Sequence, residues 1–170
     1  MTKTEKQTPP DPQQDFRIFA PGDFRPNLVL SLKPRWAQKI LNGTKRVEVW
    51  RRFSRTWAGS HVLLYASTPV KAVVGSARIR EIEHGSPELL WTYYGNALGC
   101  RPDELEDYCH GCSKVWGLAL DRVHAFRRTV SLEELQSFVG SDLRPPQAYA
   151  AVKTGSPWAT ALPLIEALQQ

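Results

Sequence analysis

The chain has 170 residues, of which 42% are hydrophobic and 23% charged, and its formal net charge is +5. This composition is typical of one soluble globular domain. It excludes a wholly disordered chain, and no apolar run approaches the ~20 residues that span a bilayer. Three cysteines in a chain of this size do not make a disulfide framework, so we expect a cytoplasmic protein without a metal or other cofactor.

The N-terminal stretch is rich in proline and polar residues, with little apolar content before Phe16. Such a composition does not offset the entropy lost on ordering, so we predict a disordered leader over residues 1–26. The predicted domain spans residues 27–152. A C-terminal extension over residues 153–170 follows, with a helix from Trp158 to Leu168.

Beyond the leader, apolar runs of strand length alternate with segments of helical periodicity. The predicted strands are Leu28–Leu32, Val47–Trp50, Val62–Ala66, Val70–Ile82 and Val115–Phe126. The predicted helical segments are Pro34–Leu41, Pro87–Cys109 and Ser131–Phe138. Gly75 inside the fourth strand indicates a bulge or tight bend of the kind that a closed barrel requires. We therefore predict an α+β fold, either a mixed sheet or a small mixed β-barrel with inserted helices.

Basic residues concentrate between Lys33 and Arg55, where eight lysines and arginines accompany a single acid, Glu48. Trp36 and Trp50 lie within this segment, and Trp57 lies two residues beyond it. Between Glu81 and Asp107 the balance reverses, with seven acids and one base. A positive segment with interleaved tryptophans favours a polyanion that carries stackable bases. The alternative is a solvated basic face whose tryptophans belong to the core.

Four motifs in this order resemble the ASCH domain, a member of the PUA-like superfamily of small β-barrels. They are LSLKP at 30–34, GTKRVE at 43–48, LYASTPVKAVVG at 64–75 and RPPQAY at 144–149. Each motif is weak alone, and the ordered set is fairly specific. The resemblance covers residues 27–152.

The resemblance implies a PUA-like barrel whose cleft, lined by the G-x-K-x-x-E turn and strand, binds RNA or a nucleotide. Its first implication is therefore nucleic-acid binding through a basic cleft, with a possible regulatory role. The alternative is an enzyme. Some family members look like amidohydrolases that remove an acyl group from a modified cytidine, and ribonuclease activity is attributed to others.

Lys45 and Glu48 are the leading site candidates. Gly43 permits a tight turn before Lys45, and alternation places Glu48 on the strand face opposite its valine neighbours. Such a pair can read a base edge, hold a phosphate or, in an enzyme, act as a catalytic acid–base pair. The alternative is a structural ion pair that pins the helix to the strand.

The chain departs from the family pattern at two places. An arginine often follows two residues past the glutamate, where this chain has Trp50. Arg51 or Arg52 can substitute, and alternation places Arg52 on the Glu48 face. The amidohydrolase subset carries a threonine where this chain has Glu48, which argues against deacylation.

Further candidates for nucleic-acid binding carry hydroxyl, amide, phenol or ammonium groups: Ser31, Lys33, Ser67, Gln147 and Tyr149. Hydroxyl and amide groups suit hydrogen bonds to base edges, and Tyr149 can stack on a base. The alternatives are turn capping, packing and, for Lys33, a solvated surface charge.

The predicted partners are RNA, single-stranded nucleic acid or a modified nucleoside, and no membrane. The acidic segment 81–107 is a second possible contact, a docking site for another protein.

Cys109 and Cys112 have the spacing of half a zinc site, which Cys100 and a histidine would have to complete. Free thiols fit a cytoplasmic protein better, so no metal site is predicted.

Overall fold

The computed structural model describes residues 25–169, so nearly all of the leader predicted over residues 1–26 lies outside the described residues. The strands are β1 (Leu28–Leu32), β2 (Val47–Trp50), β3 (His61–Ala66), β4 (Ala72–Gly85), β5 (Val115–Ser131) and β6 (Tyr149–Ala151). The α-helices are α1 (Pro34–Leu41), α2 (Pro87–Tyr94), α3 (Pro102–Cys109), α4 (Leu132–Val139) and α5 (Pro157–Ala167). Two short 3-10 helices are η1 (Arg55–Trp57) and η2 (Gly95–Leu98).

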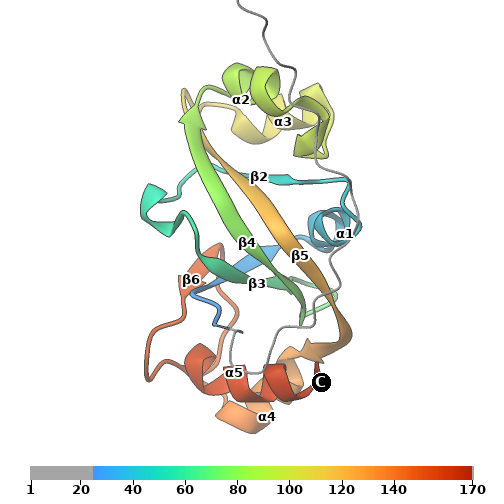
Figure 1. The fold of residues 1–170 in the computed structure, drawn as a ribbon, viewed down its shortest axis with the longest axis vertical. Helices are drawn as coiled ribbons and strands as arrows, with labels where there is room; N and C mark the ends of the chain where they lie inside the picture. The colour runs from blue at the N-terminus through green and yellow to red at the C-terminus, as the bar shows by residue number, and fades with distance from the viewer. Residues whose placement is uncertain (1–24, 170) are drawn as a thin grey trace, which may run out of the picture.

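These strands form one mixed sheet in the order β2-β5-β4-β3-β1-β6. β1 pairs with β3 in parallel, and the other neighbouring strands are antiparallel. The long strands β4 and β5 cross the molecule, with α2 and α3 at one end and α4 and α5 at the other (Figure 1). Helices inserted between the strands of one sheet make the α+β fold that the sequence predicts.

The sheet curls far enough to bring its two edge strands together through side chains. The ring centroids of Trp50 on β2 and Tyr149 on β6 are 6.0 Å apart, and Phe53 lies 4.6 Å from Tyr149. The bulge predicted at Gly75 is confirmed, since the β4–β5 register shifts there. A Cβ at Gly75 would lie 2.5 Å from the carbonyl oxygen of His124, so only glycine allows this close approach. The result is a half-barrel closed by aromatic rings.

Alternation along β1 divides its apolar side chains between two cores. Leu28 and Leu30 point into the curl of the sheet, whereas Val29 points to the outer core under α4 and α5. Tyr65 on β3 belongs to the same outer core. A third core, which includes Val47, lies between β2 and the helices α2 and α3. Burying each large apolar side chain contributes roughly 1.5–3 kcal/mol.

The segment predicted as helical over Pro87–Cys109 is interrupted, so that α2, η2 and α3 follow one another. Gly95 and Gly99 adopt φ values of 46° and 65°, a left-handed conformation that favours glycine. A Cβ at Gly99 would lie 2.5 Å from the Cβ of Lys45. The chain therefore turns twice and lays η2 against Lys45.

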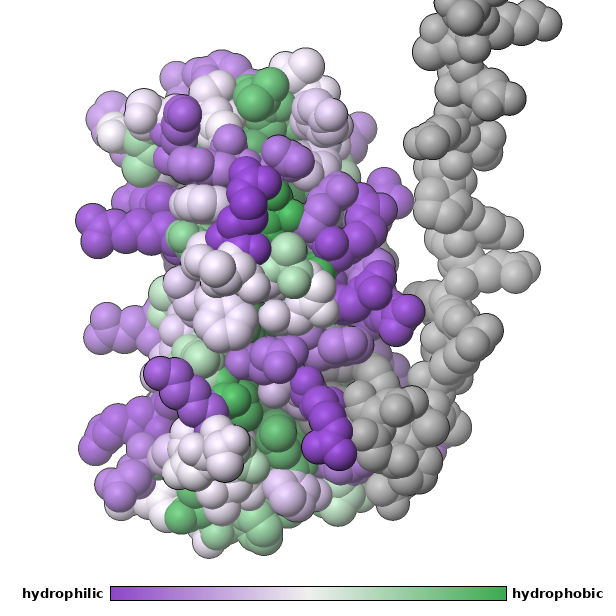
Figure 2. All heavy atoms as spheres, turned by 60° about the vertical axis from the view of Figure 1, so that its left-hand side comes forward, coloured by the Kyte–Doolittle hydropathy of each residue, from purple (hydrophilic) through white to green (hydrophobic). Residues whose placement is uncertain are grey.

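Hydrophilic side chains dominate the face shown in Figure 2, and hydrophobic side chains appear there in small, separated patches. This distribution is expected when most large apolar residues lie in the three cores. None of the helices between residues 25 and 169 has the length and apolar character needed to cross a membrane.

Candidate functional site

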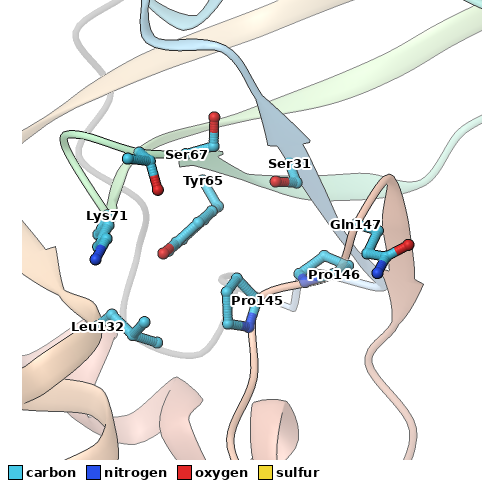
Figure 3. Close-up of a pocket in the computed structure, with 9 residues that line it drawn as sticks. Ser31, Tyr65, Ser67, Lys71, Leu132, Pro145, Pro146 and Gln147 are labelled. Carbon is cyan, nitrogen blue, oxygen red and sulfur yellow. The ribbon is translucent and has the colours of Figure 1, made fainter.

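A pocket of about 290 Å³ opens where the parallel strands β1 and β3 end. This volume is near the lower end of the ~300–1,000 Å³ typical of small-molecule sites. Its walls come from four segments that are far apart in sequence (Figure 3): Ser31, Tyr65, Ser67, Thr68, Lys71, Leu132, Pro145, Pro146 and Gln147. Of these nine residues one is a cation and none is an acid, so the lining suits an anionic ligand.

Tyr65 is the most buried of the polar groups in the pocket wall, with 1% of the residue exposed. Its hydroxyl points into the pocket between Lys71 and Pro145 (Figure 3), while its ring packs edge-on against Trp158 at 6.3 Å. Burial raises the pKa of Tyr65 above its ordinary value of 10.0. The phenol is therefore protonated at neutral pH and can donate a proton or a hydrogen bond.

Lys71 stands at the rim on the side toward which the Tyr65 hydroxyl points (Figure 3). Its φ is 48°, a left-handed conformation that costs a non-glycine residue about 1–2 kcal/mol. Two backbone hydrogen bonds hold the turn: the Lys71 N–H donates to the Ser67 carbonyl, and the Leu132 N–H donates to the Lys71 carbonyl. Within residues 25–169 no acidic side chain pairs with Lys71.

The opposite wall is the Pro145–Gln147 segment (Figure 3). The Ser31 N–H donates to the Ala148 carbonyl at 2.8 Å, and the indole N–H of Trp158 donates to the Arg144 carbonyl at 3.1 Å. One hydrogen bond therefore fixes each end of this wall. The pocket thus brings together three of the residues predicted for nucleic-acid binding, namely Ser31, Ser67 and Gln147.

Lys45 and Glu48 lie elsewhere, in a separate hollow of about 70 Å³, and share no lining residue with the larger pocket. Their side chains meet at 3.3 Å between Nζ and Oε2, with the two residues 4% and 8% exposed. Lys45 Nζ also donates to the Leu98 carbonyl at 2.6 Å and lies 5.0 Å from the centre of the Trp36 ring. Burial raises the pKa of Glu48, against the opposing effect of the Lys45 charge. The hollow is therefore much smaller than the pocket of about 290 Å³.

The acidic segment folds onto the basic one. The Arg35 guanidinium pairs with Glu104 at 2.6 Å, and Lys39 Nζ donates to the Gly99 carbonyl. Arg51 donates to the Tyr108 carbonyl at 2.7 Å, with its guanidinium 4.9 Å from the centre of the same tyrosine's ring. Four of the eight basic residues in segment 33–55, namely Arg35, Lys39, Lys45 and Arg51, therefore already contact acceptors of this chain.

The remaining predicted residues are placed as follows. Strand β2 ends at Trp50, so the alternation that would put Arg52 on the Glu48 face does not extend to it, and Arg52 is exposed. Lys33 is exposed at the N-cap of α1. Tyr149 packs its ring on Phe53 rather than lining the pocket.

Sequence analysis missed Tyr65 and Lys71. The available signal was a tyrosine within a buried apolar strand, two residues before Ser67 and so on the same face. Lys71 carries no such signal because the turn after β3 decides where it points.

Among the described residues no group of three or more His, Cys, Asp or Glu could hold a metal, and Cys100, Cys109 and Cys112 are free thiols.

The curled six-stranded sheet with these inserted helices defines the ASCH/PUA-like class of α+β fold. The family model described as a domain of unknown function, DUF365, matches residues 28–144. An ASCH domain-containing ribonuclease of Zymomonas mobilis is 32% identical over 124 residues, which are 73% of this chain and 82% of the relative. The chain therefore belongs to the ASCH domain family.

Two crystal structures of the Zymomonas mobilis ASCH protein agree with the fold. The first has a TM-score of 0.72 at 28% identity and covers 81% of this chain and 94% of its own. The second, a point mutant, has a TM-score of 0.75 at 26% identity and covers 86% of this chain and all of its own.

Proposed function

We propose that this protein binds single-stranded RNA and cleaves it in the 290 Å³ pocket. The observation that carries the proposal is the buried Tyr65 phenol, which points into an open pocket beside Lys71. RNA supplies the anionic phosphate that such a pocket suits. The similarity to a protein named a ribonuclease supports the same chemistry.

In the proposed reaction the ribose 2′ oxygen attacks the adjacent phosphorus. The O2′–P bond forms, the P–O5′ bond breaks, and the 5′ oxygen leaves. Lys71 offsets the negative charge on the phosphate, and the Tyr65 phenol gives its proton to the leaving oxygen. Water takes up the proton of the 2′ hydroxyl and returns one to the Tyr65 phenolate. Ser31, Ser67 and Gln147 supply hydrogen bonds that orient the nucleotide.

Several observations favour this pocket over the Lys45–Glu48 hollow. The Lys45 ammonium already contacts a carboxylate, a carbonyl and an indole ring. The hollow measures about 70 Å³ against about 290 Å³ for the larger pocket, so it is the less roomy site for a base. The RNA-contacting or acid–base role predicted for Lys45 and Glu48 stays a prediction, and exposed Lys33 and Arg52 remain candidates for phosphate contacts.

The Tyr65→Phe variant tests the proposal, because it removes one hydroxyl and keeps the ring. Loss of a general acid lowers the cleavage rate roughly 10²- to 10⁴-fold, and we expect this loss with little change in RNA affinity. Cleavage of an end-labelled single-stranded RNA is followed on gels, and binding by fluorescence anisotropy. Tyr93→Phe is the matched control, since Tyr93 is 75% exposed on α2.

A Tyr65→Phe variant that cleaves at the wild-type rate would contradict the assigned role. Wild-type protein that binds RNA and leaves it intact would reduce the proposal to binding alone.

A further inference from the structure

Trp158 lies on α5, outside the residues 28–144 that the family model matches. It is the second residue of the helix, directly after Pro157, and the helix is capped by Ser156, whose hydroxyl accepts from the Ala159 N–H. Only 5% of Trp158 is exposed. The indole therefore has a fixed position beneath the pocket, set by a segment that the matched family region does not include.

One indole contacts both sides of the pocket. Its ring meets the Tyr65 ring edge-on, with centroids 6.3 Å apart and planes at 77°. Its Nε1 donates to the Arg144 carbonyl at 3.1 Å, directly before the Pro145–Gln147 wall. We propose that Trp158 is a positioning residue that sets the Tyr65 hydroxyl at a fixed place relative to this wall. The inference rests on the proposed cleavage at Tyr65.

The composition of the wall explains why it needs such an anchor. Pro145 and Pro146 have no N–H groups, so this part of the wall cannot hold itself by donating backbone hydrogen bonds. Its fixed points are carbonyls at its two ends, Arg144 bonded by Trp158 and Ala148 bonded by the Ser31 N–H. Without the indole N–H, the Arg144 carbonyl loses its hydrogen bond, and the nearest remaining one at this end is from Gln136 Nε2 to the Leu143 carbonyl, one residue farther from the wall. The substrate would then meet a looser wall.

The helix itself is well anchored for this task. Ala161 and Ile165 on α5 are fully buried in the outer core, which also contains Tyr65. Ile165 supplies a matched control, because Ile165→Val removes one methylene from the same helix and core. The pocket lining does not include Ile165.

Two substitutions at Trp158 separate its two contacts. Trp158→Phe keeps an aromatic ring against Tyr65 and removes the indole donor. We expect KM for single-stranded RNA to rise roughly three- to tenfold, the loss typical of one hydrogen bond, with kcat within about twofold of wild type. Trp158→Leu removes the ring contact as well, so kcat also falls, roughly 10- to 100-fold.

A second readout requires no RNA. Hydrogen–deuterium exchange of the segment 144–151 is expected to speed up in Trp158→Phe and to stay unchanged in Ile165→Val. A merely structural role for Trp158 predicts instead that all variants change in proportion to their loss of Tm. Kinetics and exchange in Trp158→Phe that match those of Ile165→Val would overturn the inference.

The outcomes distinguish this inference from the proposed function. If Tyr65→Phe abolishes cleavage while Trp158→Phe and Trp158→Leu behave like Ile165→Val, cleavage at Tyr65 stands and the positioning role fails. If Tyr65→Phe cleaves normally, the proposed function fails, and exchange of the 144–151 segment alone decides whether Trp158 holds the wall.

Discussion

At Lys45 and Glu48, burial and charge pairing act against each other. Each residue is more than nine-tenths buried, so its charge has lost hydration, and the 3.3 Å contact returns part of that loss. The Glu48 Oε2 atom has no hydrogen bond in the described part of the chain, which leaves its pairing dependent on Lys45. Replacing one residue of the pair should therefore destabilise the protein more than replacing both together.

A double-mutant cycle tests this at single residues. Lys45→Met leaves the Glu48 carboxylate buried without its partner, which costs roughly 3–5 kcal/mol. The double variant Lys45→Met/Glu48→Leu should lose less than the sum of the two single changes. Urea unfolding measures all four proteins, and strictly additive losses would contradict a coupled pair.

Glu48 also makes stability depend on pH in a defined direction. Burial raises its pKa in the folded state above the ordinary 4.5, so the folded protein holds this proton more tightly than the unfolded chain does. The stabilisation of the folded state by this proton is fully present below about pH 4.5 and is lost as pH rises through the raised pKa of Glu48. In Glu48→Gln this dependence disappears, so the wild-type minus variant difference in unfolding free energy should fall with rising pH. Urea titrations between pH 4.5 and 8 measure it, and a difference that grows with pH contradicts the sign.

At the scale of elements, the close contact between β4 and β5 sets the curl of the sheet. Gly75 permits it because the nearest atoms are a backbone carbonyl of β5 and the Leu41 side chain of α1, both within 2.6 Å of where a Cβ would be. A backbone atom in a paired strand cannot move away cheaply.

Gly75→Ala therefore forces β4 and β5 apart and should cost roughly 1–3 kcal/mol, the usual range for overpacking. Gly85→Ala in the same strand is the matched control. The three atoms nearest to its Cβ would all belong to Leu89, a flexible side chain that is 52% exposed. Thermal unfolding compares the two variants, and equal losses would show that the contact with β5 is not limiting.

For the whole molecule, the net charge of +5 overstates the free positive surface. Contacts with α3 and the preceding turn engage Arg35, Lys39, Lys45 and Arg51. We therefore expect RNA affinity to depend on few phosphate contacts, with Lys71 among them.

Lys71→Ala should reduce the slope of log K against log salt by about 0.7, because binding of a single strand then releases roughly one counterion fewer. Fluorescence anisotropy at several salt concentrations measures the slope. Arg101→Ala is the control, since Arg101 already pairs with Asp103 on α3. An unchanged slope in Lys71→Ala would place Lys71 outside the RNA contact.

The sequence by itself determined the local elements, because neighbours within a few residues decide them. The apolar run that forms β1, the bulge at Gly75 and the Ser131–Glu134 capping box that starts α4 are all readable from such short-range patterns. The ordered ASCH motifs likewise led to the correct family.

Only the tertiary structure decided which side chains meet. Tyr65 and Lys71 share a pocket with Gln147 because β1 lies between β3 and β6 and because α5 supports both walls. Lys45 is buried because η2 lies across it. These contacts depend on strand order, curl and the docking of distant segments, whose energies come from burial that no short stretch of sequence encodes.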